Sequence, residues 1–308
     1  MSKKVFVTGG SGFVGWNLTN FLLDQGYKVY TTYNGGGNLP DKRAEIISRN
    51  YFGINLENLK FDVVFHTAAN NDARCQNVKY LNDLNVKDTE SLFNVCYQNG
   101  CRHFVYSSST AIYGNQPVPY IEDETIIDPL NYYGLSKASM EHAVNRFLQQ
   151  KKDCIAIALR YCNVYGFGEF HKNHRASMIY QMIFKKIFNI QINLFNDGNQ
   201  KRDWVYVEDV VKANYLASKH DKSDYFNVGS GVSVSFNELA EIMELKESNL
   251  LNYIDCPFEK EYQKHTLCSL EKINKCLGYN PSHNIKDNII NLEKKLREYF
   301  KMPSYIFH

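Results

Sequence analysis

A serine, a tyrosine and a lysine stand at spacings suited to moving a proton to and from a hydroxyl or carbonyl group. Serines occupy positions 107–109 after an apolar segment, and Tyr133 precedes Lys137 by one helical turn. A tyrosine with a pKa of about 10 is a poor base at neutral pH, but a neighbouring ammonium favours its phenolate. We therefore predict Ser109, Tyr133 and Lys137 as catalytic residues, with Ser109 sharing the substrate's proton.

Glycines spaced for phosphate binding lie near the start of the chain. Gly9, Gly12 and Gly15 follow an apolar segment at 5–8 and open a helical pattern at 13–25. Glycine lets the backbone turn tightly and approach a pyrophosphate, while the helix directs its first amides and its positive dipole end at the phosphates. Because strand and helix both stand where this motif needs them, the loop predicts a dinucleotide site rather than a structural turn.

The end of the second apolar segment, 28–33, bears on the choice between NAD and NADP. It runs into Tyr33 and Asn34 without the carboxylate that would bind the ribose 2′-hydroxyl of NAD. Lys42 or Arg43 could instead meet a 2′-phosphate, although surface cations are common without such a role. The sequence leaves both cofactors open and favours NADP.

Alternating apolar and helical segments must position these groups. Strands are expected at 5–8, 28–33, 63–66, 103–106 and 155–159, and helices at 13–25, 80–98 and 136–149. This order predicts an α/β fold, a doubly wound parallel sheet of the Rossmann type. After Tyr165 the alternation weakens. We expect a dinucleotide-binding domain over 1–165, with a strand and helix returning near 205–230, and a smaller interwoven substrate lobe over 166–308.

The overall composition excludes several classes of protein. With 44% hydrophobic and 22% charged residues and a net charge of +2, the chain has no basic block for a nucleic-acid partner. No apolar run approaches the roughly 20 residues of a membrane span, and the N-terminus lacks a signal peptide. Eight cysteines occur without a Cys-x-x-Cys pair, which favours reduced, buried thiols over metal ligands. The sequence thus predicts a cytoplasmic protein without a metal or membrane partner.

Further motifs surround the predicted site: His66-Thr67-Ala68-Ala69, Asn85-Val86, the segment 160–166 and the segment 202–209. Together with the glycine loop and the Tyr133–Lys137 pair, they resemble the extended short-chain dehydrogenase/reductase family that modifies nucleotide sugars. The resemblance covers nearly the whole chain. It implies a tightly bound NADP or NAD, a nucleotide-diphosphate sugar as substrate and a homo-oligomer.

The resemblance also assigns roles to individual residues. Asn163, Arg175 and Arg202 are expected to bind the substrate, because arginine grips phosphate with a permanent charge. An ion pair between Arg202 and Asp203 at the lobe junction is the alternative. The residues expected at the cofactor are Gly9, Ser11, Gly12, Phe13, Val14, Gly15, Tyr33, Asn34, Ala68, Ala69, Asn85, Ser107, Tyr133 and Lys137.

Two features narrow the position within the family. Thr110 and Ala111 occupy the places where sugar 4,6-dehydratases carry an acidic pair, which argues against dehydration. The segments 169–178, 194–209 and 262–266 resemble the ADP-glycero-manno-heptose 6-epimerases. In those enzymes a tyrosine and a lysine act on opposite sides of the sugar, and the lysine corresponds to Lys172. The alternative for Lys172 is a surface or phosphate-binding lysine.

These observations predict a nucleotide-sugar epimerase of cell-surface polysaccharide biosynthesis, with a 6-epimerase acting on an NDP-heptose as the best single hypothesis. It would oxidise a carbinol transiently and return the same hydride to the other face. Lys137 would tune Tyr133, and Lys172 would be the second acid–base group. The alternatives are an epimerase, 4-reductase or dehydrogenase for a UDP-, GDP- or CDP-linked sugar, and a non-catalytic dinucleotide sensor.

Overall fold

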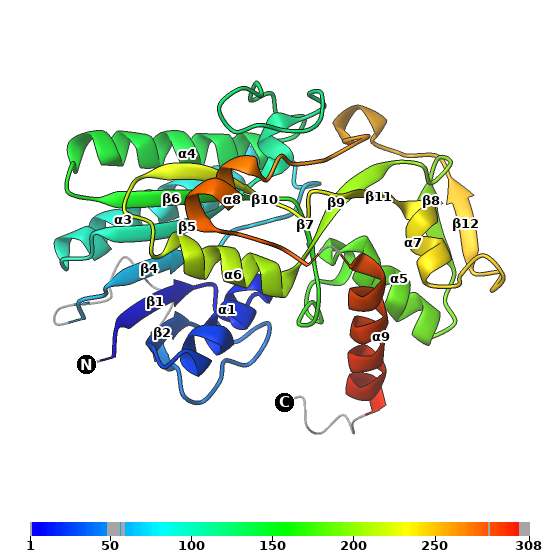
Figure 1. Cartoon of the computed structure of the whole chain (residues 1–308), viewed down its shortest axis with the longest axis horizontal. Helices are drawn as coiled ribbons and strands as arrows, with labels where there is room; N and C mark the ends of the chain where they lie inside the picture. Colours follow the sequence, from blue (N-terminus) through cyan, green and yellow to red (C-terminus); the bar gives the residue numbers. More distant parts are fainter. Residues whose placement is uncertain (1, 48–55, 57–58, 283, 302–308) are drawn as a thin grey trace.

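The computed structural model describes residues 2–47, 56, 59–282 and 284–301. A parallel sheet in the order β10-β6-β5-β4-β1-β2-β3 forms its larger part (Figure 1). Its strands are β1 (Lys4–Thr8), β2 (Lys28–Thr32), β3 (Glu45–Ile47), β4 (Val63–His66), β5 (His103–Ser109), β6 (Ile155–Tyr161) and β10 (Asp224–Val228). The α/β fold class predicted from the alternation of strands and helices is confirmed.

Helices cover both faces of this sheet because its strands are apolar on both sides. Val5 and Val7 of β1 pack on one face with α1 (Phe13–Asp24) and α6 (Val207–Ala217). Phe6 packs on the other face with α3 (Asp88–Gln98) and α4 (Tyr132–Gln150). In Figure 1 α4 lies at the top of the view, and α6 and α1 lie lower. The short α8 (Glu271–Leu277) lies beside β10 and α6.

The second lobe has a core of its own. One small sheet joins β7 (Asn163–Tyr165), β9 (Lys201–Tyr206) and β11 (Ser233–Ser235), and another pairs β8 (Ile192–Phe195) with β12 (Leu251–Ile254). Around them pack α5 (Met178–Ile187), α7 (Phe236–Ile242) and α9 (Ile285–Lys301). The chain enters this lobe after β6, returns to the large sheet through α6 and β10, and enters it again at β11.

Two predicted helices differ in detail from those observed. The helix expected to begin at residue 136 begins at Tyr132, because the Asn131 side chain caps it by accepting a hydrogen bond from the amide of Gly134. The single helix expected over 80–98 is α2 (Val78–Asn82), a π-helical turn η1 (Asp83–Lys87) and α3. Within the described part of the chain, no helix is both long and apolar enough to cross a bilayer.

Candidate active site

A cleft of ≈ 1300 Å³ lies at the carboxyl ends of the sheet strands, where ligands bind in open α/β sheets. Its walls come from the glycine loop, the ends of β4 and β5, the start of α4 and the second lobe. The predicted site residues that line it are Gly9, Ser11, Gly12, Phe13, Val14, Gly15, Asn34, Ala69, Ser107, Ser109, Tyr133, Lys137, Asn163, Lys172, Arg175 and Arg202. Residues far apart in the sequence thus meet in one space.

The loop between β1 and α1 has the shape that a pyrophosphate needs. Gly9 has φ +72°, and a Cβ there would lie 2.8 Å from the backbone nitrogen of Ala68. A Cβ at Gly15 would collide with the carbonyl oxygen of Gly9. The N-cap of α1 is Gly12, which supplies no side-chain hydrogen bond, so the first amides of the helix are left for phosphate oxygens. These residues fit the dinucleotide that the sequence predicts.

The residues beyond β2 bear on the cofactor's adenosine end. Arg43 is held by two carboxylates, with Nη2 2.8 Å from Asp41 and Nη1 2.9 Å from Asp24. Hydrogen bonds from the Arg43 side chain and backbone lower the pKa of Asp41 to about 2. These two ion pairs compensate the charge of Arg43, which argues against its use for a 2′-phosphate. Asn34 lines the cleft and offers a neutral amide instead.

Three predicted cofactor residues stand beside the cleft rather than in its lining as the described residues form it: Tyr33, Ala68 and Asn85. Ala68 forms the floor against which Gly9 packs. Asn85, in the π-helical turn, accepts a hydrogen bond from the amide of Asn70 (2.8 Å) and donates one to Ser136 Oγ (2.9 Å). It thereby ties the loop after β4 to α4.

Ser109, Tyr133 and Lys137 meet at the start of α4. Burial raises the pKa of Tyr133, and a hydrogen bond with Ser109 opposes that rise. Lys137 Nζ donates to the carbonyl oxygen of Ser107 at 2.8 Å. Burial lowers the pKa of Lys137 to about 8, while the charge of Glu141 opposes this change. The three side chains have the types and the proximity for acid–base chemistry on a carbinol.

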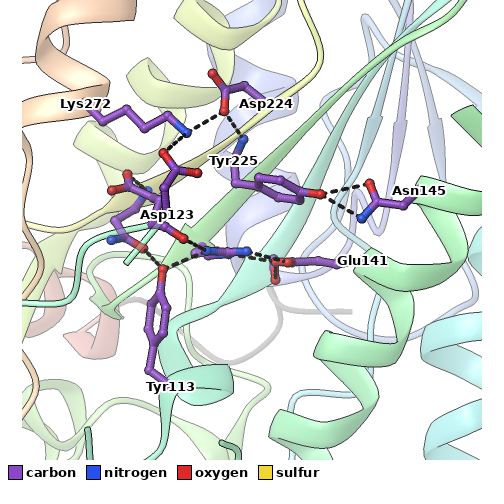
Figure 2. Close-up of polar contacts among 11 residues, drawn as sticks. Tyr113, Asp123, Glu141, Asn145, Asp224, Tyr225 and Lys272 are labelled. Atoms are coloured by element: carbon purple, nitrogen blue, oxygen red, sulfur yellow. Dashed lines mark hydrogen bonds and ion pairs between the residues drawn. The ribbon is translucent and has the colours of Figure 1, made fainter. Parts of the chain in front are cut away.

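A buried polar network joins α4 to the neighbouring strands (Figure 2). Glu141, on the turn after Lys137, forms a two-pronged ion pair with Arg160 of β6, at 2.7 Å and 3.0 Å. The same carboxylate accepts a hydrogen bond from Ser108 Oγ at 2.5 Å. Arg160 also donates to the hydroxyl of Tyr113 at 2.8 Å. The carboxylate of Glu141 on α4 therefore bonds both to β5 and to β6.

Lys172 enters the cleft from the second lobe. Its ammonium lies 2.8 Å from Glu169 Oε2 and 4.9 Å from the ring centroid of Phe13 on the glycine loop. Glu169 is fully buried and also accepts hydrogen bonds from the amide and the hydroxyl of Ser177. Lys172 is thus held beside the cofactor loop by a fixed carboxylate, and it is not a free surface lysine.

Arg202 lies at the other end of the cleft and is nearly buried. It donates to the carbonyl oxygens of Lys201 (2.8 Å) and Lys264 (3.3 Å) and stacks 4.8 Å from the Tyr262 ring. The alternative ion pair with Asp203 is wrong, because that carboxylate instead accepts hydrogen bonds from Ser230, Gly231 and Cys268. Burial lowers the pKa of Arg202, so an anion here would stabilise its charge.

Two cysteines that look unrelated in the sequence lie together. Cys162 Sγ and Cys268 Sγ are 2.6 Å apart, both are buried, and Cys162 also lines the cleft. With Asp203 they form a group that could hold a metal ion. The Asp203 oxygens already accept several protein hydrogen bonds. Spacing in the sequence gave no signal for this pair, because 106 residues separate its members.

Sequence reasoning missed further residues that line the cleft. They include Asp72, Arg74 and His171, and Phe195, Phe258 and Tyr262, which form an aromatic group in the second lobe. A loop after a buried strand at the site was a usable signal for Asp72 and Arg74. The aromatic group offered none, because its members come from separate segments.

Comparison with known proteins bears directly on this geometry. Residues 5–229 match the NAD dependent epimerase/dehydratase family. The chain is 30% identical to the ADP-L-glycero-D-manno-heptose-6-epimerase of Brachyspira hyodysenteriae, over 92% of this chain and 95% of that protein. The crystal structure of the Helicobacter pylori ADP-L-glycero-D-manno-heptose-6-epimerase is similar with a TM-score of 0.84, at 30% identity, covering 96% of each chain.

A UDP-N-acetylglucosamine 4-epimerase from Methanobrevibacter ruminantium is similar with a TM-score of 0.87 at 27% identity, over 97% of this chain and 99% of that one. The family resemblance inferred from the motifs is confirmed. Since the matched segment 5–229 includes the glycine loop, the strand ends and the helix that carries Tyr133 and Lys137, this chain belongs to the NAD dependent epimerase/dehydratase family.

Proposed function

We propose that this protein is a nucleotide-sugar epimerase that inverts C6 of an ADP-glycero-manno-heptose. One observation carries the proposal: Tyr133, with Lys137 behind it, and Lys172 line the same cleft from different lobes. Inverting a carbinol by oxidation and return of the hydride needs proton transfer at each face of the sugar. The likeness to two heptose 6-epimerases supports this substrate over the UDP-, GDP- or CDP-linked alternatives.

In the proposed mechanism the nicotinamide, when bound, supplies a hydride acceptor that later gives the hydride back. Ser109 hydrogen-bonds the reacting oxygen, and Tyr133 takes or returns its proton. Lys137, one helical turn after Tyr133, would orient the nicotinamide ribose, and its charge would favour the phenolate. The oxidised C6 group of the sugar then rotates. Lys172 would transfer the proton at the second face as Tyr133 does at the first.

The other predicted residues would hold the substrate. Arg202 is the candidate for the diphosphate, because its charge is buried and, among the described residues, no carboxylate pairs with it. Asn163, at the start of β7, faces the same cleft, and Arg175 is an exposed cation at its mouth. All three stay predictions of substrate contact.

We infer NAD rather than NADP as the cofactor. The family is NAD dependent, and Arg43 is occupied by Asp41 and Asp24. A cytoplasmic location stays a prediction of the sequence, and a role in cell-surface polysaccharide biosynthesis and a homo-oligomeric state stay predictions of the family resemblance. Light scattering on the purified protein measures the oligomeric state.

Proton NMR of an ADP-glycero-manno-heptose incubated with the protein and a trace of NAD tests the proposed function. We expect the two C6 epimers to equilibrate without net consumption of cofactor. Turnover only with stoichiometric consumption of NAD(P)(H) would replace the epimerase with a reductase or dehydrogenase. A protein that binds the dinucleotide but leaves this and other nucleotide sugars unchanged would be a sensor.

A further inference from the structure

The loop that follows β4 reaches across the cleft to the second lobe. Arg74 and Asp72 of this loop both line the cleft. The Arg74 guanidinium lies 5.1 Å from the ring centroid of Phe258, and Asp72 Oδ2 is 3.6 Å from His174 Nε2. Phe258 and His174 both belong to the second lobe. The loop therefore joins the two walls of the cleft near its mouth.

The start of this loop is fixed from below. The backbone of Asn70 both donates to and accepts from the Asn85 side chain, at 2.8 Å and 3.0 Å. Asp72 then accepts a hydrogen bond from the backbone amide of Arg74 at 2.9 Å. This turn directs the Arg74 side chain into the cleft, and stacking on Phe258 holds the guanidinium there.

Arg74 carries a permanent charge that no carboxylate of the described residues neutralises. Asp72 meets its backbone rather than its guanidinium. In the part of the chain that the structure describes, no carboxylate forms an ion pair with Arg74, although Glu261 also lines the cleft. Its guanidinium lies instead against the aromatic ring of Phe258.

Arg74 and Arg202 act on the same end of the cleft. Burial raises the pKa of Tyr262, and the charges of Arg202 and, less strongly, Arg74 oppose that rise. Arg202 stacks on the Tyr262 ring, and Tyr262 lies beside Phe258 at a centroid distance of 6.3 Å. Two arginines from opposite walls therefore flank one aromatic pair.

We propose that Arg74 is a second cationic contact for the diphosphate of the nucleotide-sugar substrate, supplied by the loop after β4 from the wall opposite Arg202. The proposal rests on the function proposed above. A diphosphate carries a charge on each phosphate, and two guanidinium groups that pair with no carboxylate of the described residues match it. Because Arg74 comes from the sheet domain and Arg202 from the second lobe, the bound diphosphate would bridge the two.

Isothermal titration of the full-length, NAD-loaded protein with ADP and with UDP tests this role. Saturation with NAD keeps ADP out of the cofactor site. We expect Arg74→Gln to weaken binding of the preferred diphosphate roughly tenfold to a hundredfold, as loss of a charged hydrogen bond does. Arg74→Lys should keep part of the affinity. The affinity of the wild type should also fall more steeply with salt than that of Arg74→Gln.

Arg297→Gln is the matched control, because Arg297 is an exposed arginine on α9 that pairs with Glu293 and does not line the cleft. It should leave diphosphate binding unchanged. In turnover assays Arg74→Gln should raise KM more than it lowers kcat, since Arg74 moves no proton. Wild-type affinity in Arg74→Gln, or an equal loss in Arg297→Gln, overturns the proposal.

The two proposals fail in different ways. Diphosphate binding that depends on Arg74 in a protein that epimerises no heptose keeps the role of Arg74 and removes the proposed reaction. Active epimerisation with full diphosphate binding by Arg74→Gln keeps the reaction and removes the role of Arg74.

Discussion

At the scale of single residues, the charges near Tyr133 are set by burial and by fixed neighbours. His66 at the end of β4 is neutral, because burial lowers its pKa to about 3 and its ring nitrogens meet the hydroxyls of Thr8 and Thr89. Lys137 is buried as well, yet its charge is supported by Glu141. Of these two buried groups, Lys137 is the one that titrates near physiological pH, with a pKa of about 8.

Lys137 should give the enzyme an alkaline limit. Burial places its pKa at about 8 instead of the ordinary 10.5. As pH rises through about 8 the ammonium loses its proton and no longer favours the phenolate of Tyr133, so kcat/KM should fall in a pH–rate profile. A flat profile up to 10.5 would contradict this role.

The same shift makes a prediction about stability. Between about 8 and 10.5 the unfolded chain holds this proton and the folded chain does not, so the free energy of unfolding contributed by Lys137 rises with pH in that window. The free energy of unfolding measured with urea should therefore rise for the wild type relative to Lys137→Met as pH rises through the window.

Lys172→Met should lower the rate of epimerisation by a factor on the order of 10²–10⁴, the usual contribution of a general acid–base group. NAD binding should persist, which fluorescence titration checks. Lys246→Met is the matched control, because Lys246 also pairs with a glutamate, Glu241, but lies exposed on the surface. Epimerisation within a few fold of the wild type in Lys172→Met would remove Lys172 from the mechanism.

At the scale of elements, the glycine loop and α4 do most of the positioning. The glycine loop was predictable because backbone geometry itself dictates glycine there: Gly9 combines a positive φ with a close approach to Ala68. The π-helical turn that carries Asn85 was not predictable, since local spacing gives no sign of the hydrogen bond that Asn85 makes to Ser136 on a separate segment.

Gly9→Ala should reduce NAD affinity strongly, because the new Cβ meets the backbone of Ala68 and the loop must move. Gly26→Ala separates this effect from backbone strain: Gly26 has a similar φ of +80°, but a Cβ there meets nothing within 4 Å. Both variants should lose about 1 kcal/mol of stability to the positive φ. Equal NAD affinities for the two in fluorescence titration would contradict the close approach.

The ion pair behind α4 should couple strongly to stability. Glu141→Gln or Arg160→Met alone leaves a buried group without its partner, which costs about 3–5 kcal/mol. The double variant should lose clearly less than the sum of the two, as a double-mutant cycle by urea unfolding would measure. Additive losses would show that the network in Figure 2 is not energetically coupled.

At the scale of the whole molecule, the cleft forms where the chain crosses between the sheet domain and the second lobe. The first half of the chain carries periodic signals, so the sheet and the Tyr133–Lys137 helix were predictable from sequence. The second lobe is built from short strands whose pairings, such as β8 with β12, join distant segments. The aromatic group around Tyr262 and the contact of Arg74 with Phe258 depend on those pairings, so local patterns could not predict them.

The central claim is that one hydride leaves C6 of the sugar and returns to its other face. Mass spectrometry of the products from an ADP-glycero-manno-heptose deuterated at C6 tests this most directly. The account predicts that the inverted product keeps its deuterium, with none exchanged into water. Loss of the deuterium to solvent would contradict it, because inversion would then proceed by removal of a proton from carbon rather than by hydride transfer.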